Sequence, residues 1–383
     1  MTETQPVLGC HRKCLYPAGA LFLCLLQLVI DGILGRSNLE VLEGSTKSYQ
    51  SASGSHRARF VPTFLWGIPS VDNDNERIRR ETIRETYLSF YKDSKEFPDR
   101  VCSLNDILRN KVPFEDCQVA YAFFIGANPD GPTELLFPNK SYPMLANPPQ
   151  SSKIRSEDDI VYLNIRENQE DGKMPTWFKF ASMITEEKKY PFDYIAKIDS
   201  DTLIFMPAFL EFSETHMMDT TRLVHAGYPM FDYFCNPQAR NHSHPCPIPL
   251  TGELYMSGEA SIMSSELARI MTSRECNRSG LFIRHEDVLL SNWAFHCVAS
   301  TRNNSTVHIV PIRREQILRD QSKGLRSKIL PHRFSYTLLA HASGSKSYYK
   351  DTRNFRQTWT DYLEYWTNKN STRTVVSFKI TRF

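Results

Sequence analysis

Two aspartates stand one residue apart where an apolar run ends. The run is YIAKI, residues 194–198, and Asp199 and Asp201 follow it before a second apolar segment begins. A carboxylate beside a buried strand is destabilising unless a cation or hydrogen-bond donors compensate its charge. Two carboxylates at this spacing suit Mg²⁺ or Mn²⁺, which can hold a diphosphate and offset charge on a leaving phosphate. Chance and Ca²⁺ loops also produce such pairs, but the preceding strand makes Asp199 and Asp201 candidate ligands of a divalent cation.

Three arginines recur at helical spacing in the segment DNDNERIRRETIRETYLSFYK, residues 72–92. Arg77, Arg80 and Arg84 fall on one face of a helix that begins with acidic residues. They form either a solvated face interleaved with glutamates or, since the helix follows the first predicted strand, a group that contacts a nucleotide or braces its loop. The spacing is compatible with both interpretations.

Three further residues could complete a catalytic site. Glu286 and Asp287 precede the helix-like pattern VLLSNW. They either complement the helix dipole or, if they face the same cleft as Asp201, supply the base that deprotonates an incoming hydroxyl. His341 ends an apolar strand-like run, and it is either a structural histidine or a metal ligand.

Alternating strands and helices are expected to position these residues. In the N-terminal half the patterns predict, in chain order, a strand at 60–70, a helix at 72–92, strands at 117–127 and 158–165, a helix at 174–190 with Pro175 near its first turn, and a strand at 194–198. This alternation predicts an α/β domain with a mostly parallel sheet, in which ligands bind beyond the carboxyl ends of the strands. Asp199 and Asp201 fall at that edge.

The C-terminal half of the chain is less regular. It predicts a helix following 255–273, another in 285–297, and strands at 306–312 and 336–342, whereas the type of 222–233 stays unassigned. No linker divides residues 60–383, so one domain is expected.

Composition excludes several classes of protein. With 383 residues, 41% of them apolar and 23% charged, the chain can bury a large core and is neither disordered nor collagen-like. A net charge of +3 without a Lys/Arg cluster does not indicate a nucleic-acid partner.

An apolar stretch near the start of the chain predicts a membrane anchor. Arg12 and Lys13 precede uncharged residues 14–30, which as a helix would span roughly 26 Å, at the short end for a bilayer. The basic flank predicts a cytoplasmic tail at 1–13, a signal-anchor helix at 14–35 and a lumenal remainder that starts with a flexible Ser/Gly-rich stem at 36–59. A cleaved signal peptide is the alternative, and it leads to the same side of the membrane.

Cysteines and glycosylation sequons agree with a lumenal compartment. Three of the nine cysteines lie in or before the anchor, and the other six form an even set. Pairing of near neighbours, as 102–117, 235–246 and 276–297, is the simplest of the possible connectivities. Six Asn-x-Ser/Thr sequons follow the anchor, at Asn139, Asn241, Asn277, Asn303, Asn304 and Asn370.

Five segments in this order resemble one enzyme family: RRETIRETY, DGKMPTWFKF, YIAKIDSDTLI, YMSGEASIMS and HEDVLLSNW. They are similar to the β1,3-glycosyltransferases of the GT-A type, in particular the trypanosomatid enzymes that use UDP-galactose or UDP-N-acetylglucosamine. The animal β1,3-galactosyl- and N-acetylglucosaminyltransferases are related to these. The resemblance covers about residues 60–341. It implies a Rossmann-like nucleotide-sugar domain in a single-pass type II protein of the Golgi membrane.

The resemblance also implies a role for each candidate residue. Asp199 and Asp201 would hold Mn²⁺ (or Mg²⁺) and the UDP diphosphate, with His341 completing the metal site. Asp287 would be the general base of an inverting transfer, with Glu286 beside it. The implied nucleotide-sugar residues are Arg80, Arg84, Lys179, Asp199, Ser257 and Gly258. The acceptor would be a glycan on a glycoprotein or glycolipid, extended in protein glycosylation or chain elongation.

Three departures from the family pattern remove none of these residues. Tyr87 stands where animal relatives commonly have Trp, Ser200 replaces the middle acid of DDD, and VLLSNW lacks a Gly often found after EDV. The last change concerns the acceptor side. The donor, galactose or N-acetylglucosamine, is left open.

Two other functions compete with the transferase. DSDTL approaches the signature of haloacid-dehalogenase-like phosphatases, but Leu203 occupies its fifth position and no G-D-x-x-x-D segment follows. A catalytically inactive, lectin-like relative of the same fold remains the alternative.

Overall fold

The computed structural model describes ten segments of the chain. They are residues 61–90, 100–148, 157–168, 172–186, 190–232, 253–276, 286–302, 305–319, 337–341 and 351–371. All of them belong to the unit Phe60–Phe383. The predicted tail, anchor and stem lie outside the described residues, and among the described helices none is long and apolar enough to cross a membrane.

The N-terminal half alternates between strands and helices, as its sequence pattern predicts. Its elements are β1 (Phe64–Pro69), α2 (Asp74–Glu85), β2 (Val101–Ser103), α3 (Leu104–Leu108), β3 (Val119–Gly126), β4 (Ile160–Leu163), α4 (Lys173–Glu186) and β5 (Tyr194–Ile198), with 3₁₀ turns at Tyr87–Ser89 and Phe114–Asp116. Helix α2 starts where Asn73 accepts a hydrogen bond from the Glu76 backbone N–H at 2.8 Å, which is a side-chain N-cap.

The C-terminal half contains the elements that were hardest to predict. They are β6 (Thr202–Ile204), α5 (Met206–His216), β7 (Leu223–Asp232), β8 (Glu253–Ser264), α6 (Ser265–Met271), α7 (Glu286–Thr301), β9 (Val307–Pro311), the 3₁₀ turn Arg314–Gln316, β10 (Ile317–Arg319), β11 (Leu339–His341) and α8 (Thr352–Ser371). The helix expected after 255–273 instead begins inside that segment, at Ser265, because residues up to Ser264 extend β8.

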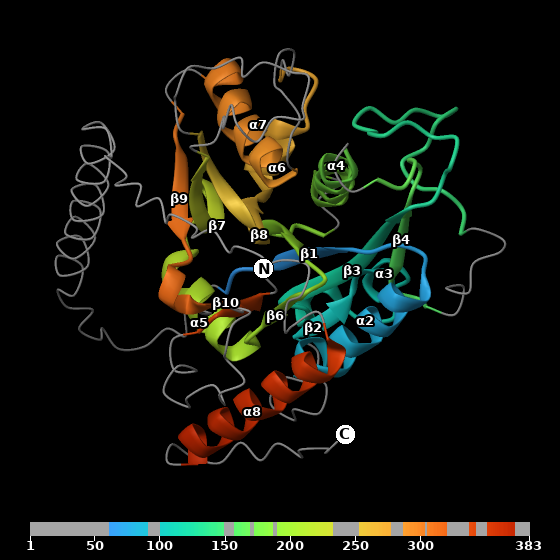
Figure 1. The fold of residues 1–383 in the computed structure, drawn as a ribbon. Helices are drawn as coiled ribbons and strands as arrows, with labels where there is room; N and C mark the ends of the chain where they lie inside the picture. The colour runs from blue at the N-terminus through green and yellow to red at the C-terminus, as the bar shows by residue number, and fades with distance from the viewer. Residues whose placement is uncertain are drawn as a thin grey trace, which may run out of the picture. The chain divides into compact units, whose positions relative to one another are not determined.

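A mostly parallel sheet forms the centre of the domain (Figure 1). Its order is β2-β3-β1-β5-β8-β7-β9, with β4 pairing the same edge of β3 further along. Strand β8 runs antiparallel to both β5 and β7, and the other pairs are parallel. The predicted class, α/β with a mostly parallel sheet, is confirmed.

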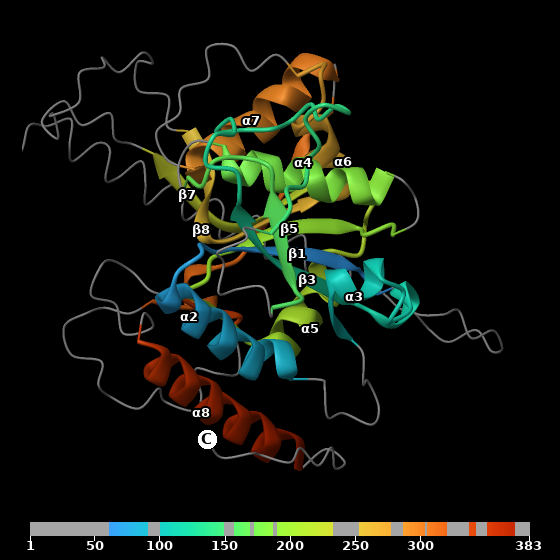
Figure 2. The ribbon, with the colours of Figure 1, turned by 90° about the vertical axis from the view of Figure 1, so that its right-hand side faces the viewer.

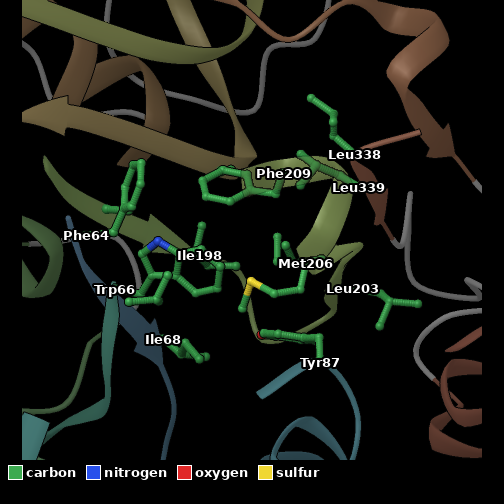
Figure 3. Close-up of a cluster of buried hydrophobic side chains, with 14 of the residues drawn as sticks. Phe64, Trp66, Ile68, Tyr87, Ile198, Leu203, Met206, Phe209, Leu338 and Leu339 are labelled. Atoms are coloured by element: carbon green, nitrogen blue, oxygen red, sulfur yellow. The ribbon is translucent and has the colours of Figure 1, made fainter. Parts of the chain in front are cut away.

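Helices cover both faces of this sheet, which explains why its strands are apolar throughout. Figure 2 shows α4, α6 and α7 over one face and α2, α5 and α8 over the other. Alternate residues of β1 enter the two cores: Trp66 packs on the α5 side, whereas Leu65 packs on the α4 side. Figure 3 shows the first core, where Phe209 meets Trp66 edge to face at 5.2 Å between ring centroids.

A second, three-stranded sheet joins segments far apart in the sequence. Its order is β10-β11-β6, and β11 runs antiparallel to β6 so that His341 pairs with Thr202. Because Thr202 directly follows Asp201, this register places β11, the last strand among the described residues, beside the aspartate pair. The sequence pattern does not predict this sheet, because its strands are short and pair over long distances in the chain.

Two of the three predicted disulfides are present. Cys102 is bonded to Cys117, and Cys276 is bonded to Cys297. The first joins β2 to the residues before β3, and the second joins the segment after α6 to α7. The remaining predicted pair, 235–246, lies outside the described residues.

Strand β7 buries an unusual titratable group. His225 is fully buried, and its Nε2 lies 3.0 Å from Oγ of Ser261 on β8. Burial lowers the pKa of His225 from 6.5 to about 3. Between those two values the unfolded chain binds a proton that the folded chain excludes, so stability is lost as the pH falls through this window.

Replacing His225 by glutamine is therefore expected to make stability less dependent on pH. At about pH 5 the wild type should have lost about 2 kcal/mol through this histidine relative to neutral pH, and His225→Gln should not show that loss. Urea unfolding at about pH 8 gives the packing cost of the substitution, and the same measurement at about pH 5 gives the ionisation cost. An identical pH slope in both proteins would contradict this role for His225.

Candidate active site

A polar cavity of about 470 Å³ opens at the carboxyl edge of the parallel strands. Its walls come from the end of β1 and the residues after β1, β4 and β5, the first two turns of α2, the first turns of α4 and α7, and the end of β11. They are Pro69, Ser70, Val71, Glu76, Arg79, Glu167, Asn168, Lys173, Met174, Asp199, Ser200, Asp201, Glu286 and His341. Ligands of α/β domains bind at this edge, because loops from several strands converge there.

Three predicted metal ligands converge on this cavity. One ligand atom from each of Asp199, Asp201 and His341 lies within 4.8 Å of the others. The end of β5 supplies the two aspartates, and the pairing of β11 with β6 brings His341 to them. His341 Nδ1 lies 3.4 Å from Asp201 Oδ1.

The chemistry of this donor set fits Mn²⁺ or Mg²⁺. Carboxylates suit both ions, and an imidazole favours the transition metal. The Thr202 hydroxyl lies 3.0 Å from His341 Nδ1. A hydrogen bond of this kind orients the imidazole of a ligating histidine, and one ring nitrogen of His341 remains available to a cation.

A buried lysine links the metal side of the site to the predicted base. Lys197 Nζ lies 2.7 Å from Asp199 Oδ1, 3.0 Å from Glu286 Oε1 and 3.2 Å from Asp287 Oδ1. It also donates to the Gly258 carbonyl at 3.1 Å. Lys197 is not among the residues predicted from the sequence, although a cation inside a buried strand, two residues before Asp199, points to the same face.

The charges of this cluster shift one another's pKa values. Burial alone would lower the pKa of Lys197, but the carboxylates of Asp199, Glu286 and Asp287 hold it well above its usual range. Burial raises the pKa of Asp199 well above its usual range, and neighbouring carboxylates act in the same direction against the opposing Lys197. Burial also raises the pKa of Glu286. Three carboxylates, those of Asp199, Glu286 and Asp287, surround this one ammonium, and this excess of acidic groups favours a bound cation.

Gly258 is the position where a side chain would block this cluster. A Cβ there would fall 2.6 Å from Asp287 Oδ2 and 2.9 Å from Asp199 Oδ2, so only glycine lets both carboxylates approach β8. Ser257 is half-buried beside it on the same strand and does not line the cavity.

Arg80 and Arg84 do not reach the cavity lining. Arg80 is fully buried and binds both oxygens of Glu157, while Arg84 binds Glu157 and Asp159. Arg80 also bonds Ser70 and Val71, which do line the cavity. Of the interpretations given from the sequence, bracing of a loop matches these contacts, and a fully buried Arg80 rules out the solvated face at that position.

Lys179 also lies away from the cavity. Burial lowers the pKa of Lys179, and the charged groups that also act on it are Glu186, Arg274 and Arg269. None of these three lines the cavity. Lys173, six residues earlier on the same helix, occupies the cavity wall instead.

Of the six predicted glycosylation sites, Asn139 is the one whose side chain lies within the described part of the structure. It is exposed in a turn, where its Oδ1 accepts from the Tyr142 backbone N–H at 2.8 Å. The side chains of the other five sequon asparagines lie outside the described residues.

A family model agrees with the site. Residues 149–305 match the model of the Galactosyltransferase family. This chain carries a galactosyltransferase-family segment. The segment contains Asp199, Asp201, Gly258, Glu286 and Asp287, whereas α2 and His341 lie outside it. The match agrees with the resemblance to β1,3-galactosyltransferases and supports a glycosyltransferase.

Other comparisons add little. Curated proteins give no match to this chain. A solved glycosyltransferase involved in the glycosylation of the major capsid of PBCV-1 is similar over 77% of this chain and 100% of that chain, with 7% identity and a TM-score of 0.32. That similarity is too distant to carry an inference.

Proposed function

We propose that this protein is an inverting, metal-dependent glycosyltransferase with a GT-A type catalytic domain. It transfers galactose or N-acetylglucosamine from a UDP-sugar to a hydroxyl of a glycan on a glycoprotein or glycolipid, forming a β1,3 linkage. The observation that carries the proposal is the convergence of Asp199, Asp201 and His341 on one cavity, with Glu286 and Asp287 joined to them through Lys197.

The donor occupies the cavity with its nucleotide toward Ser70 and Val71 and its diphosphate toward the aspartates. Asp199, Asp201 and His341 would hold Mn²⁺ or Mg²⁺, which when bound offsets the negative charge of the diphosphate. The cavity lining joins the two ends, because it includes both Ser70 and Asp201.

The transfer is a single displacement. The acceptor oxygen forms a bond to the anomeric carbon while the bond from that carbon to the phosphate oxygen breaks, and UDP leaves with the electron pair. The Asp287 carboxylate takes the hydroxyl proton, and Lys197 fixes that carboxylate at 3.2 Å. Attack opposite the leaving group inverts the anomeric configuration.

The proposal includes a position in the Golgi membrane. Residues 14–35 anchor the chain as a single-pass type II protein, and the catalytic domain lies in the lumen. The disulfides Cys102–Cys117 and Cys276–Cys297 support an oxidising compartment.

Transfer by the full-length chain tests the proposed function. With Mn²⁺ and a panel of glycan acceptors, UDP-galactose or UDP-N-acetylglucosamine should yield a product one sugar heavier by mass spectrometry, and linkage analysis should give a β1,3 bond. Chelation by EDTA should abolish the product. Glycan binding without transfer from any UDP-sugar would instead favour the lectin-like alternative.

A further inference from the structure

The segment after β1 forms one wall of the cavity and is held in an unusually complete set of contacts. Ser70 and Val71 both line the cavity, and Ser70 is buried. The Ser70 backbone N–H donates to the Phe124 carbonyl at 3.1 Å, and its hydroxyl donates to Glu76 at 3.3 Å. Two buried cations approach the same segment from different elements.

The first cation is Lys173, at the start of α4. Its Nζ donates to the Ser70 carbonyl at 2.6 Å and to Glu167 Oε1 at 2.5 Å. The other oxygen of Glu167 accepts from the Gly126 backbone N–H at 2.8 Å. This pair therefore connects the ends of β1 and β3 to the segment after β4.

The second cation is Arg80, on α2. Its Nη1 donates to Ser70 Oγ at 2.7 Å and to the Val71 carbonyl at 3.1 Å. Its Nε and Nη2 bind the two oxygens of Glu157 at 2.9 and 2.8 Å. Such a two-point pair fixes both the position and the plane of the guanidinium.

Folding stability alone is a poor reason to keep these ion pairs. Removing charges from water costs much of what a buried pair gains, so well-packed apolar residues often stabilise a fold equally well. The two pairs share one further property: in each, the cation also donates a hydrogen bond to Ser70 or to its neighbour Val71. Both of these residues face the cavity that also contains the Asp199, Asp201 and His341 group.

We infer that Lys173 with Glu167, and Arg80 with Glu157, are positioning residues that fix the Ser70–Val71 wall in the shape that binds the nucleotide end of the donor. The inference rests on the proposed function for the identity of the ligand. A preformed wall lowers the cost of ordering a loop when the ligand binds. Arg80 and Glu157 lie outside the cavity lining and act through Ser70 and Val71, whereas Lys173 and Glu167 hold Ser70 and also line the cavity themselves. Loss of either pair should weaken donor binding more than it slows the chemical step.

The main test is the double variant Glu167→Gln/Lys173→Met, which removes the pair without leaving one charge buried alone. Its dissociation constant for UDP in Mn²⁺, measured by titration calorimetry, should rise about 10- to 100-fold, and the donor KM should rise with it while kcat changes little. The matched control is Asp106→Asn/Lys111→Met, which removes an exposed pair with a 2.9 Å contact outside the cavity lining and should bind UDP like the wild type. Unchanged UDP affinity in the folded Glu167→Gln/Lys173→Met protein would overturn the inference.

Hydrogen exchange tests the positioning role without any nucleotide. In the double variant the peptide that contains Ser70 and Val71 should exchange roughly tenfold faster than in the wild type. If the wild type binds no UDP, the proposed function fails, and equal exchange rates would then still overturn the positioning role. Arg80→Met/Glu157→Gln should give the same two effects, and a change in kcat alone would contradict positioning.

Discussion

Replacement of Asp287 by asparagine is expected to lower kcat for sugar transfer by about 10²- to 10⁴-fold, with little change in the affinity for UDP. The amide has nearly the same shape as the carboxylate, but it cannot accept the proton of the acceptor hydroxyl. Lys197 keeps its contacts with Asp199 and Glu286 in this variant, so the metal side of the site should be unaffected. Steady-state kinetics and UDP calorimetry on the same preparation measure the two quantities.

Glu286→Gln is the matched comparison, because Glu286 is the adjacent acid and binds the same ammonium. Its side chain is 15% exposed against 28% for Asp287, and burial raises its pKa. The more accessible carboxylate is the better placed to meet an acceptor arriving from solvent, so the smaller loss is expected for Glu286→Gln. A larger loss in Glu286→Gln than in Asp287→Asn would transfer the role of base to Glu286.

Local rules were sufficient to predict the centre of the candidate site. Asp199 and Asp201 follow a short apolar strand, and in a parallel sheet that position lies at the ligand-binding edge. The approach of His341 depends on the register between β6 and β11. The resemblance to a known family implied this approach, whereas the residue pattern around His341 left its role open.

The strands β7 and β8 were missed for a physical reason. Residues 222–233 contain Gly227 and Pro229, which interrupt a strand pattern, and the pairing with β8 shifts register between these two residues. Strand β8 in turn carries Gly258 and Glu259 in its middle. Long-range pairing decides this structure, and single-sequence patterns do not contain it.

The sequence places Lys179 and Arg80 on the correct helices, but it does not identify the residues that their side chains contact. Lys173 and Lys179 share α4, yet six residues correspond to 1.7 turns, about 240° around the axis, so the two side chains leave in different directions. The sequence does not say which direction meets the cavity. Likewise the partner of Arg80 is Glu157, a residue 77 positions away that only the folded chain brings close.

The second large effect is expected from the metal ligands. Replacing Asp201 by asparagine should reduce transfer by on the order of 10³-fold at ordinary Mn²⁺ concentrations, because the ion stabilises the leaving diphosphate by several kcal/mol. Asp201 is one of the three donors whose ligand atoms lie within 4.8 Å of one another, and an amide is a weaker ligand than a carboxylate. Calorimetric titration with Mn²⁺ and UDP, together with activity over a range of Mn²⁺ concentrations, checks both consequences.

Asp219→Asn is the control for this experiment, since Asp219 is an exposed acid that pairs with Arg222 at 2.6 Å outside the cavity lining. It should leave both Mn²⁺ binding and transfer unchanged. The two catalytic-site variants should then differ in UDP binding. Asp201→Asn should lose Mn²⁺-dependent UDP binding together with turnover, whereas Asp287→Asn should keep UDP binding and lose turnover. Transfer that survives both EDTA and Asp201→Asn would show that these carboxylates hold no catalytic ion.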